Sequence, residues 1–430
     1  MTSNATIDTV TDGVLSDLKV VELTHLIAGP YCGMLLADEG ADVVKIEPPQ
    51  GEQSRARQPV RQTDEGTVSG YYGSLNRRKS SVVLDLKSEG GSDICERLLG
   101  EADVFITNMR ASALERLGIH PVELRERYPR LIIAVISGFG LFNSGQDANR
   151  AGLAMVGEAL SGSTGLTRDR SGRPVWCGFA LGDIAAAMTA HSAILLALRH
   201  REQTGEGRLI DLALPECTLP FMTVALARIQ SASSDVAQAA GSNNFHGVPY
   251  GVFEAKDGYF NIGVNRDELW QRLARAIGRP ELGDDPRYAT YLERSKRKAE
   301  VEEAVEAWSR KLPRDEVIEA ITRADVPVAP VLDMQEVFEL EHFHDRGMYI
   351  EVDDGIGDTF VQPTDPTGFA VQERARIPRL GEHRDAVLTG RFGLSQHEIA
   401  ALAYAGAFGP NQVEEELQVT PSVAGAGRQK

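Results

Sequence analysis

The first half of the chain alternates short apolar runs with segments of helical character. From Leu18 it reads as the β-branched run LKVVELT, a turn HLIAG, a helical stretch that begins at Pro30, and a second apolar run, DVVKIE. Proline suits the first helical position because its missing N–H would be unpaired there anyway. The alternation continues with apolar runs at 81–86, 103–107 and 131–137 and with helical segments from Ser88, in ASALERLG and around 148–160. This spacing predicts a parallel sheet covered on both faces, and we interpret this half as Rossmann-like.

The pattern changes after a long apolar segment. Gly182 and Asp183 introduce IAAAMTAHSAILLALRHRE, whose continuous apolar character predicts a helix buried on most sides, and RLIDLAL (208–214) returns as a strand. GVFEAKDGYFNIGV (251–264) predicts a β-hairpin, and charged amphipathic helices follow near 296–311 and 313–324. We therefore expect an α/β protein in which a smaller α+β domain is inserted into the Rossmann-like one. The predicted boundaries are 1–224 for the large domain, 225–330 for the small domain and 331–430 for the return to the large domain.

The last part of the chain, from residue 331, has weaker patterns. It contains short strands such as MYIEV, the segment PRLGEHRDAVL and a helix that begins at Ser395. The Ala/Gly/Ser-rich end VTPSVAGAGRQK is predicted to be disordered, because it offers too little apolar surface to pack.

Composition and charge narrow the classes of partner. The 430 residues include 45 lysines and arginines against 62 aspartates and glutamates, a formal net charge of −17 with a pI near 5.1. Such a charge repels polyanions, so neither nucleic acid nor an anionic membrane is expected as a partner. Cys32, Cys95, Cys177 and Cys217 are far apart, which suggests neither a disulfide framework nor a zinc cluster. The N-terminal residues lack an apolar signal segment and the uncharged stretch 184–198 is too short to span a bilayer, so we expect a cytoplasmic protein.

Most signatures of enzyme families are missing from the sequence. It contains no G-x-x-x-x-G-K-[ST], H-E-x-x-H or G-x-S-x-G segment. The first turn carries only Gly29 and Gly33, so the dinucleotide fingerprint is absent, and Glu47 is interpreted as a solvated strand end. His342 and His344 are two residues apart in a polar segment, which we interpret as a surface pair. No metal site is predicted.

Asp183 occupies a chemically distinctive position. It follows Leu181 and Gly182 and directly precedes the long apolar helix, where unpaired helix-start N–H groups and the helix dipole stabilise an anion. Aspartate is also a favoured N-cap residue, and most N-cap residues have no further role. Position alone therefore leaves Asp183 open between a helix cap and a catalytic carboxylate.

A series of stretches follows in a characteristic order and spacing. They are LSDLKVVELTHLIAGPYCGMLLADEGADVVKIEPPQGEQSR, LNRRKSSVVLDLK, ADVFITNMRASALERLGI, ISGFG, GFALGDIAAAMTA with LRHREQTGEGRLIDLAL, PYGVFEAKDGYFNIGV, VPVAPVLD and LGEHRDAVL. In these stretches the chain resembles, almost from end to end, the class III CoA-transferases, which include formyl-CoA transferase, carnitine CoA-transferase and α-methylacyl-CoA racemase. The resemblance implies a large Rossmann-like domain built from both chain ends, a smaller inserted domain, and two subunits interlocked as a homodimer.

The resemblance also implies an activity. These transferases move CoA between acyl-CoA and free carboxylic acids, without a permanently bound cofactor, and their nucleophile is an aspartate after a glycine in a segment like ALGD, here Asp183. The carboxylate would attack the donor acyl-CoA to give a mixed anhydride and CoA thiolate. The thiolate would then attack the aspartyl carbonyl, which frees the donor acid and leaves an aspartyl-CoA thioester, and the acceptor acid would reverse these steps. Covalent intermediates divide the exchange into easier steps.

Several further positions match residues that contact substrate in the family. The CoA contacts fall on Leu26, Ile27, Ala28, Lys79, Asn108, Met109, Arg116 and Leu117. Lys79 and Arg116 are the expected phosphate partners. Backbone N–H groups of the turn Ser137-Gly138-Phe139-Gly140 are candidate oxyanion donors. Arg55 also matches a family position and is a candidate partner for a substrate carboxylate, with a solvated loop arginine as the alternative.

Three departures from the family pattern bear on the reaction. Ile27 stands where formyl-CoA transferase has a glutamine, and its tetraglycine loop has no counterpart in GSNNFHGVPYG, which disfavours an oxalate-specific enzyme. Racemases carry a histidine after Arg-Ala-Gly, but Leu153 follows that tripeptide here, so a two-base proton exchange lacks one of its bases. A 2-methylacyl-CoA racemase of the same fold, an NAD-dependent Rossmann oxidoreductase and a non-catalytic CoA-binding subunit remain as alternatives.

Overall fold

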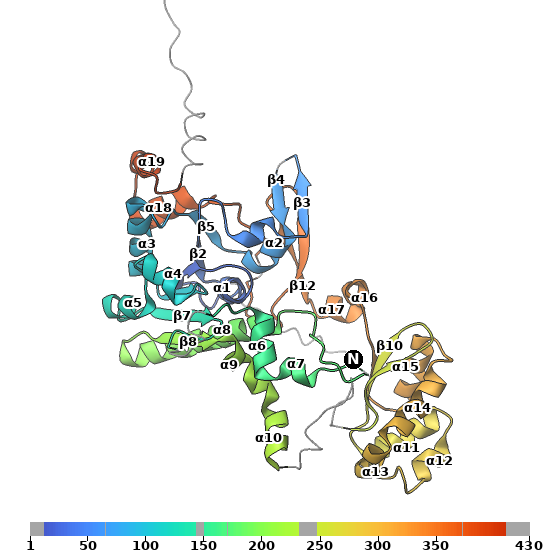
Figure 1. Ribbon diagram of the computed structural model, residues 1–430. Helices are drawn as coiled ribbons and strands as arrows, with labels where there is room; N and C mark the ends of the chain where they lie inside the picture. The colour runs from blue at the N-terminus through green and yellow to red at the C-terminus, as the bar shows by residue number, and fades with distance from the viewer. Residues whose placement is uncertain are drawn as a thin grey trace, which may run out of the picture. The chain divides into compact units, whose positions relative to one another are not determined.

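The computed structural model describes residues 13–64, 66–142, 150–169, 171–231, 247–371 and 373–409 of the chain. Within these ranges a six-stranded parallel sheet forms the centre of the larger part (Figure 1). Its strands, in spatial order, are β5 (Ser80–Val83), β2 (Asp42–Glu47), β1 (Lys19–Leu23), β6 (Val104–Thr107), β7 (Ile132–Ser137) and β8 (Leu209–Ala213). The chain therefore runs from β1 to one edge, crosses back, and continues to the other edge, which is the strand order of a Rossmann sheet. The prediction of a parallel, Rossmann-like sheet is confirmed.

Helices cover both faces of this sheet, which explains why its strands are apolar on both sides. Successive side chains of a strand point to opposite faces. Val20 packs with the helices on one face, and the next residue, Val21, packs with those on the other. The first face is covered by α1 (Ala28–Asp38) and α8 (Leu181–Thr204); the second is covered by α3 (Glu89–Glu101), α4 (Ala111–Arg116), α5 (Pro121–Arg127), α18 (Arg384–Phe392) and α19 (Gln396–Tyr404).

Helix α8 is buried on one side only, so the prediction of burial on most sides is wrong. Its small residues, among them Ala186 and Ala190, pack against the sheet, whereas Met188 and Leu196 are 56% and 70% exposed. In the described chain α8 is the helix that is long and apolar enough to cross a membrane, judged by length and composition alone. The uncharged stretch 184–198 that was considered in the sequence is shorter than this helix, which spans Leu181–Thr204. Its alanine-rich face against the sheet is typical of a core helix.

Chain contacts divide the protein into two units. The first comprises Met1–Leu160, Ala180–Pro220 and Phe343–Lys430, and the second Ser161–Phe179 and Phe221–His342. The predicted hairpin lies in the second unit and is confirmed, since β9 (Tyr250–Glu254) pairs antiparallel with β10 (Tyr259–Gly263). β11 (Val328–Pro330) adds a third strand. The helices of this unit include α11 (Asp267–Ala276), α12 (Pro280–Asp284), α13 (Tyr291–Lys296), α14 (Lys298–Ser309) and α15 (Arg314–Arg323), and they surround a core that contains Trp270.

Shorter elements complete the first unit. They include η1 (Gln53–Ala56), β3 (Val60–Thr63), β4 (Gly66–Ser69), α2 (Gly70–Asn76), α6 (Ala154–Ser161), β12 (Tyr349–Asp353), β13 (Thr359–Pro363) and β14 (Ala375–Arg376). The strand predicted at MYIEV is β12, and Ser395 caps α19 by accepting a hydrogen bond from the Glu398 N–H. The predicted disordered end lies outside the described residues, as do residues 241–246 of GSNNFHGVPYG.

Candidate active site

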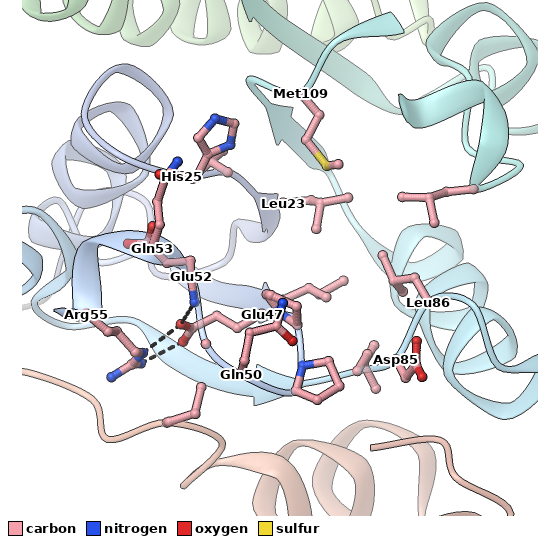
Figure 2. A pocket seen from close by; sticks show the side chains of 18 of the residues that line it. Leu23, His25, Glu47, Gln50, Glu52, Gln53, Arg55, Asp85, Leu86 and Met109 are labelled. Atoms are coloured by element: carbon pink, nitrogen blue, oxygen red, sulfur yellow. Dashed lines mark hydrogen bonds and ion pairs between the residues drawn. The ribbon is translucent and has the colours of Figure 1, made fainter. Parts of the chain in front are cut away.

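A cavity of about 980 Å³ opens at the carboxyl ends of β1, β2, β5 and β6 (Figure 2). The chain leaves β1 and β6 in opposite directions, and ligands of parallel α/β sheets bind at such a switch point. Leu23, His25 and Met109 line the cavity beside these strand ends, and the loop after β2 supplies most of another wall. Leu380, from near the end of the chain, lines it as well.

A buried ion pair fixes the loop after β2. The Glu47 carboxylate accepts hydrogen bonds from Arg55 Nε at 2.7 Å and Nη2 at 2.6 Å, and from the Glu52 N–H, as Figure 2 shows. Although burial opposes ionisation, Arg55 lowers the pKa of Glu47 to about 2. The interpretation of Glu47 as a solvated strand end is wrong, because it is fully buried. Arg55 is paired with this carboxylate. Its contacts therefore match neither a bond to a substrate carboxylate nor a solvated loop arginine, the two roles considered for it.

Residues from near the chain end close the same region. Arg55 Nη1 donates to the Pro378 carbonyl at 3.2 Å, and the Gly381 N–H donates to Ser81 Oγ at 2.9 Å. Ser81 Oγ in turn donates to Glu47 at 2.6 Å, and the Ser81 N–H donates to His383 Nδ1. The segment 378–383 is thereby fastened to β5 and to the ion pair.

The turn after β1 is fixed by the side chain of Asn108, which follows β6. The Asn108 amide accepts from the His25 N–H at 2.9 Å and donates to the His25 carbonyl at 2.7 Å. Leu26 has φ = 63°, a left-handed conformation that is uncommon for leucine. Asn108 was predicted to contact CoA; its side chain holds the turn from which Leu26, Ile27 and Ala28 follow.

Lys79 lies in the interior rather than at the cavity. Its ammonium contacts Glu22 Oε2 at 2.8 Å and donates to the Pro30 carbonyl at 2.7 Å, while Lys45 contacts the other Glu22 oxygen at 2.9 Å. All three side chains are fully buried. Burial lowers the pKa of Lys79 to about 8. An ammonium enclosed in this way cannot reach a phosphate in the cavity, whereas the exposed Lys87 lines it.

Asp183 is in the first turn of α8, two residues after its first residue. The N-cap is Ala180, so the expectation that Asp183 caps the helix is wrong. The N–H of Gly182, which would otherwise be unpaired, donates to Glu158 Oε1 of α6 at 3.1 Å, and Glu158 is almost completely buried. Burial, and after it the charge of Glu158, raise the pKa of Asp183 to about 6. Asp183 is therefore a half-buried carboxylate whose pKa is close to neutral pH. None of the ion pairs within the described ranges involves it.

Comparison with known proteins decides the family. The profile of CoA-transferase family III matches residues 15–384. The chain belongs to this family. It is 32% identical over 392 residues to the succinyl-CoA–D-citramalate CoA-transferase of Chloroflexus aurantiacus (90% of this chain, 96% of the relative). It is 33% identical over 386 residues to the succinyl-CoA:mesaconate CoA-transferase of Haloarcula hispanica (87% of this chain, 96% of the relative). A CAIB/BAIF family protein from Brucella suis superposes with a TM-score of 0.78 at 30% identity, covering 88% of this chain and 99% of that one.

This transferase therefore moves CoA between an acyl-CoA and a carboxylic acid. The racemase and oxidoreductase alternatives are not favoured. In the turn predicted to bind oxyanions, the Gly140 N–H donates to Ser137 Oγ at 2.8 Å, and the Leu141 N–H donates to the Asp211 carboxylate at 2.9 Å. The N–H of Gly140 is therefore already paired within this turn.

The cavity brings together some of the predicted site residues. Met109, Leu117 and Arg55 line it, whereas Asp183, Lys79 and the turn 137–140 do not. Arg116 is exposed in the last turn of α4. Glu158 was not predicted from the sequence, because a single glutamate in a helical segment carries no signal. Glu22 was not predicted either, although a charge within the apolar run LKVVELT is a detectable sign of a buried partner.

The pKa of Asp183 predicts the pH dependence of the transferase. As a nucleophile Asp183 would have to be ionised, so we expect the rate of enzyme acylation to rise with pH and level off, with a midpoint near 6. Glu158→Gln retains an oxygen for the Gly182 N–H but removes the charge, so the midpoint should fall. It should stay above the value of about 3.9 for an exposed aspartate, because burial is the larger cause. Single-turnover rates from pH 4.5 to 8 measure both midpoints; an unchanged midpoint in Glu158→Gln would contradict the assignment.

Proposed function

We propose that the transferase works through covalent intermediates on Asp183. The observation that carries this proposal is the state of that carboxylate: half-buried, at a helix start, and raised in pKa to about 6. Because the Gly182 N–H is bonded to Glu158, that donor does not reduce the basicity of Asp183. A carboxylate that is poorly solvated and weakly paired is a better nucleophile than one bound in an ion pair.

The proposed route conserves the thioester bond energy at each step. An oxygen of Asp183 attacks the thioester carbonyl, the carbon–sulfur bond breaks, and CoA leaves as a thiolate. The thiolate attacks the aspartyl carbonyl of the resulting mixed anhydride, which expels the donor acid as a carboxylate and leaves aspartyl-CoA. The acceptor carboxylate attacks this thioester and the two steps run in reverse. The N–H of Gly138, in the turn after β7, is the proposed donor to the tetrahedral oxyanions.

We place the nucleotide part of CoA in the cavity at the carboxyl ends of the strands. Its volume suits a large ligand, and its lining is largely apolar with a few polar groups. The exposed ammonium of Lys87 is the phosphate partner that we propose in place of Lys79. The backbone of Leu26, Ile27 and Ala28, with Met109 and Leu117, would contact the rest of the CoA moiety, and the exposed Arg116 stays a proposed phosphate partner.

Short dicarboxylic acids are the substrates that we propose. The two relatives described above are both named for succinyl-CoA, and their second acids, citramalate and mesaconate, also carry two carboxylates. The acids accepted by this transferase would accordingly present a second carboxylate at the end away from Asp183.

A homodimer in the cytoplasm is the form that we propose for the transferase. Apolar side chains are exposed on α6 and α8 of the first unit, among them Met155, Leu160, Met188 and Leu196 at 55–70%. A second copy of the chain covering these side chains would remove them from water, which favours association. The four cysteines are free thiols, which fits a reducing compartment.

Trapping of the intermediates tests the mechanism. The transferase is incubated with succinyl-CoA in the absence of acceptor, treated with hydroxylamine or borohydride, and digested for peptide mass analysis. We expect one modified carboxylate, Asp183, converted to its hydroxamate or reduced to the alcohol. Incubation with free CoA is the control and should give no modification. Modification at a different carboxylate, or none with any acyl-CoA that is turned over, would overturn the proposal.

A further inference from the structure

A second, smaller cavity of the first unit is lined mainly by cationic residues. Its volume is about 270 Å³, and it lies where the start of β5 meets the segment 374–383. The charged residues of its lining are Arg78, Lys79, Arg374, Arg376 and Glu382. Because Lys79 directs its ammonium to Glu22, three arginines and one carboxylate remain. In a chain with a formal net charge of −17, such a local surplus of positive charge attracts anions.

The main chain fixes two of these arginines. The Arg78 N–H donates to the Arg376 carbonyl at 3.0 Å, and Arg78 has φ = 64°, a left-handed conformation that is uncommon outside glycine. The Arg78 Nη2 donates to the carbonyls of Val371, at 2.9 Å, and Glu373, whereas its Nη1 forms no hydrogen bond within the described ranges. The exposed Arg374 side chain forms neither a hydrogen bond nor an ion pair in the same ranges. Several guanidinium donors are therefore available to a ligand.

The carboxylates in contact with these arginines do not balance their charge. Asp38 contacts Arg77 at 2.6 Å and Arg78 at 3.4 Å, so a single charge is shared between two guanidinium groups. Glu382 contacts Arg376 at 3.0 Å. An anion in the cavity would supply the counter-charge that these contacts leave missing.

His383 adds a neutral donor to the lining. Its Nδ1 accepts from the Ser81 N–H at 3.2 Å, and its own N–H donates to the Ser81 carbonyl at 3.1 Å. Burial lowers the pKa of His383, so its ring is neutral at pH 7 and the hydrogen is on Nε2. Nε2 forms no hydrogen bond within the described part of the chain, and the residue lines the cavity. The Nε2–H is therefore free to donate to an anion.

We propose that this cavity binds a phosphate group, either inorganic phosphate or the end of a small phosphate ester, through Arg78, Arg374, Arg376 and the Nε2–H of His383. Guanidinium groups suit this ligand because their donors match two phosphate oxygens at once. The cavity is below the range of about 300–1,000 Å³ that is usual for drug-sized ligands, so it fits a small anion better than a nucleotide.

Bound phosphate would also strengthen the binding of CoA. The segment 374–383, which carries two of the arginines, supplies Leu380 to the larger cavity. His383 is bonded to Ser81, whose Oγ donates to Glu47 at 2.6 Å in the wall of that cavity. An anion that restrains this segment stabilises the wall, and by linkage each ligand raises the affinity for the other. The phosphate site is independent of the proposed function, whereas this coupling rests on it.

Equilibrium dialysis with radiolabelled inorganic phosphate, at constant ionic strength and with or without saturating CoA, tests the site. We expect one phosphate per chain that CoA does not displace. Arg374→Met should weaken its binding by about 10- to 100-fold, as for a lost hydrogen bond to a charged group, and Arg374→Lys by less. Arg323→Met changes an exposed arginine of α15 and is the matched control, which should bind phosphate like the wild type. Methyl phosphate distinguishes the two sources: it displaces the label if the cavity accepts an ester and does not if the ligand is free phosphate.

The affinity for CoA, measured with and without saturating phosphate, tests the coupling. Phosphate should tighten CoA binding about fivefold in the wild type and should have no effect in Arg374→Met. Phosphate that CoA displaces, or that binds equally to the wild type and Arg374→Met, would overturn the site, as would a lack of binding. An unchanged CoA affinity with phosphate bound would overturn the coupling alone. A chain that binds phosphate but no CoA would overturn the proposed function and leave the phosphate site standing.

Discussion

Asp183→Asn is expected to abolish CoA transfer, with a fall in kcat of about 10⁴-fold. The amide cannot act as the nucleophile, and loss of one member of a covalent catalytic group produces effects of this size. The acyl-CoA should still bind with nearly unchanged affinity, because the substituted side chain has the same size and lies outside the cavity that we propose for the nucleotide. Steady-state transfer between succinyl-CoA and a labelled acid measures the loss, and equilibrium binding of CoA measures the retained affinity.

The same substitution is expected to make the folded protein more stable. The folded-state pKa of Asp183, about 6, is above the value for an unfolded chain, so the folded state disfavours the charged form. This penalty is absent at low pH, develops as pH rises from about 4 to 6, and persists above that range. Asparagine carries no charge, so at pH 7.5 we expect Asp183→Asn to gain about 1–2 kcal/mol in free energy of unfolding.

Two controls make this pair of results specific. Glu202→Gln changes an exposed acid at the far end of α8 and should alter neither activity nor stability measurably. Mass analysis of the purified Asp183→Asn protein excludes deamidation back to aspartate. Full activity in a protein free of deamidation would show that the nucleophile is another group, and a loss of CoA affinity equal to the loss of rate would indicate a binding role.

Glu22→Gln is expected to cause the largest loss of stability in the chain, about 3–5 kcal/mol. Glu22 is the shared counter-charge of Lys45 and Lys79, at 2.9 and 2.8 Å, and all three side chains are inaccessible to water. The neutral amide would leave two buried ammonium groups without a carboxylate. Urea unfolding at pH 7, followed by circular dichroism, measures the change in the free energy of unfolding.

A surface ion pair provides the matched comparison for Glu22. Glu101 pairs with Lys19 at 3.5 Å, but both side chains are more than one-third exposed, so Glu101→Gln should cost no more than about 1 kcal/mol. The double variant Glu22→Gln/Lys79→Met should recover part of the stability lost in Glu22→Gln, because it removes one of the two uncompensated charges. Equal effects of Glu22→Gln and Glu101→Gln would refute the account of a buried charge cluster.

The sheet was predictable from the sequence because its determinants are local. Burial on both faces requires uninterrupted apolar runs, and these runs are visible at 81–86, 103–107 and 131–137. The place of Asp183 near the start of a helix was also visible, but not its surroundings. Its raised pKa depends on burial and then on Glu158, which comes from a different helix and has no sequence signal. Its proposed role as nucleophile was suggested only by the resemblance to a family.

The charged residues were harder to place, because their partners are distant in sequence. Lys79 was assigned to a phosphate, yet it pairs with Glu22, which is 57 positions away on β1. Glu47 was interpreted as solvated, yet it is enclosed by Arg55 and by residues from the end of the chain. The sequence shows which side chains carry a charge. It does not show which opposite charge the fold brings to it, so buried and exposed charges cannot be separated at this level.

Residues 378–383 are attached to Arg55 and Ser81 beside the cavity, and this has a consequence for biosynthesis. Leu380 completes the lining, Pro378 accepts from Arg55, and Gly381 holds Ser81. During translation the strands emerge from the ribosome first, but they lack this final piece until nearly all of the polypeptide has been made. A nascent or prematurely terminated chain that lacks residues 378–383 therefore has an incomplete cavity wall, and its Arg55 and Ser81 lack two hydrogen bonds of the finished fold.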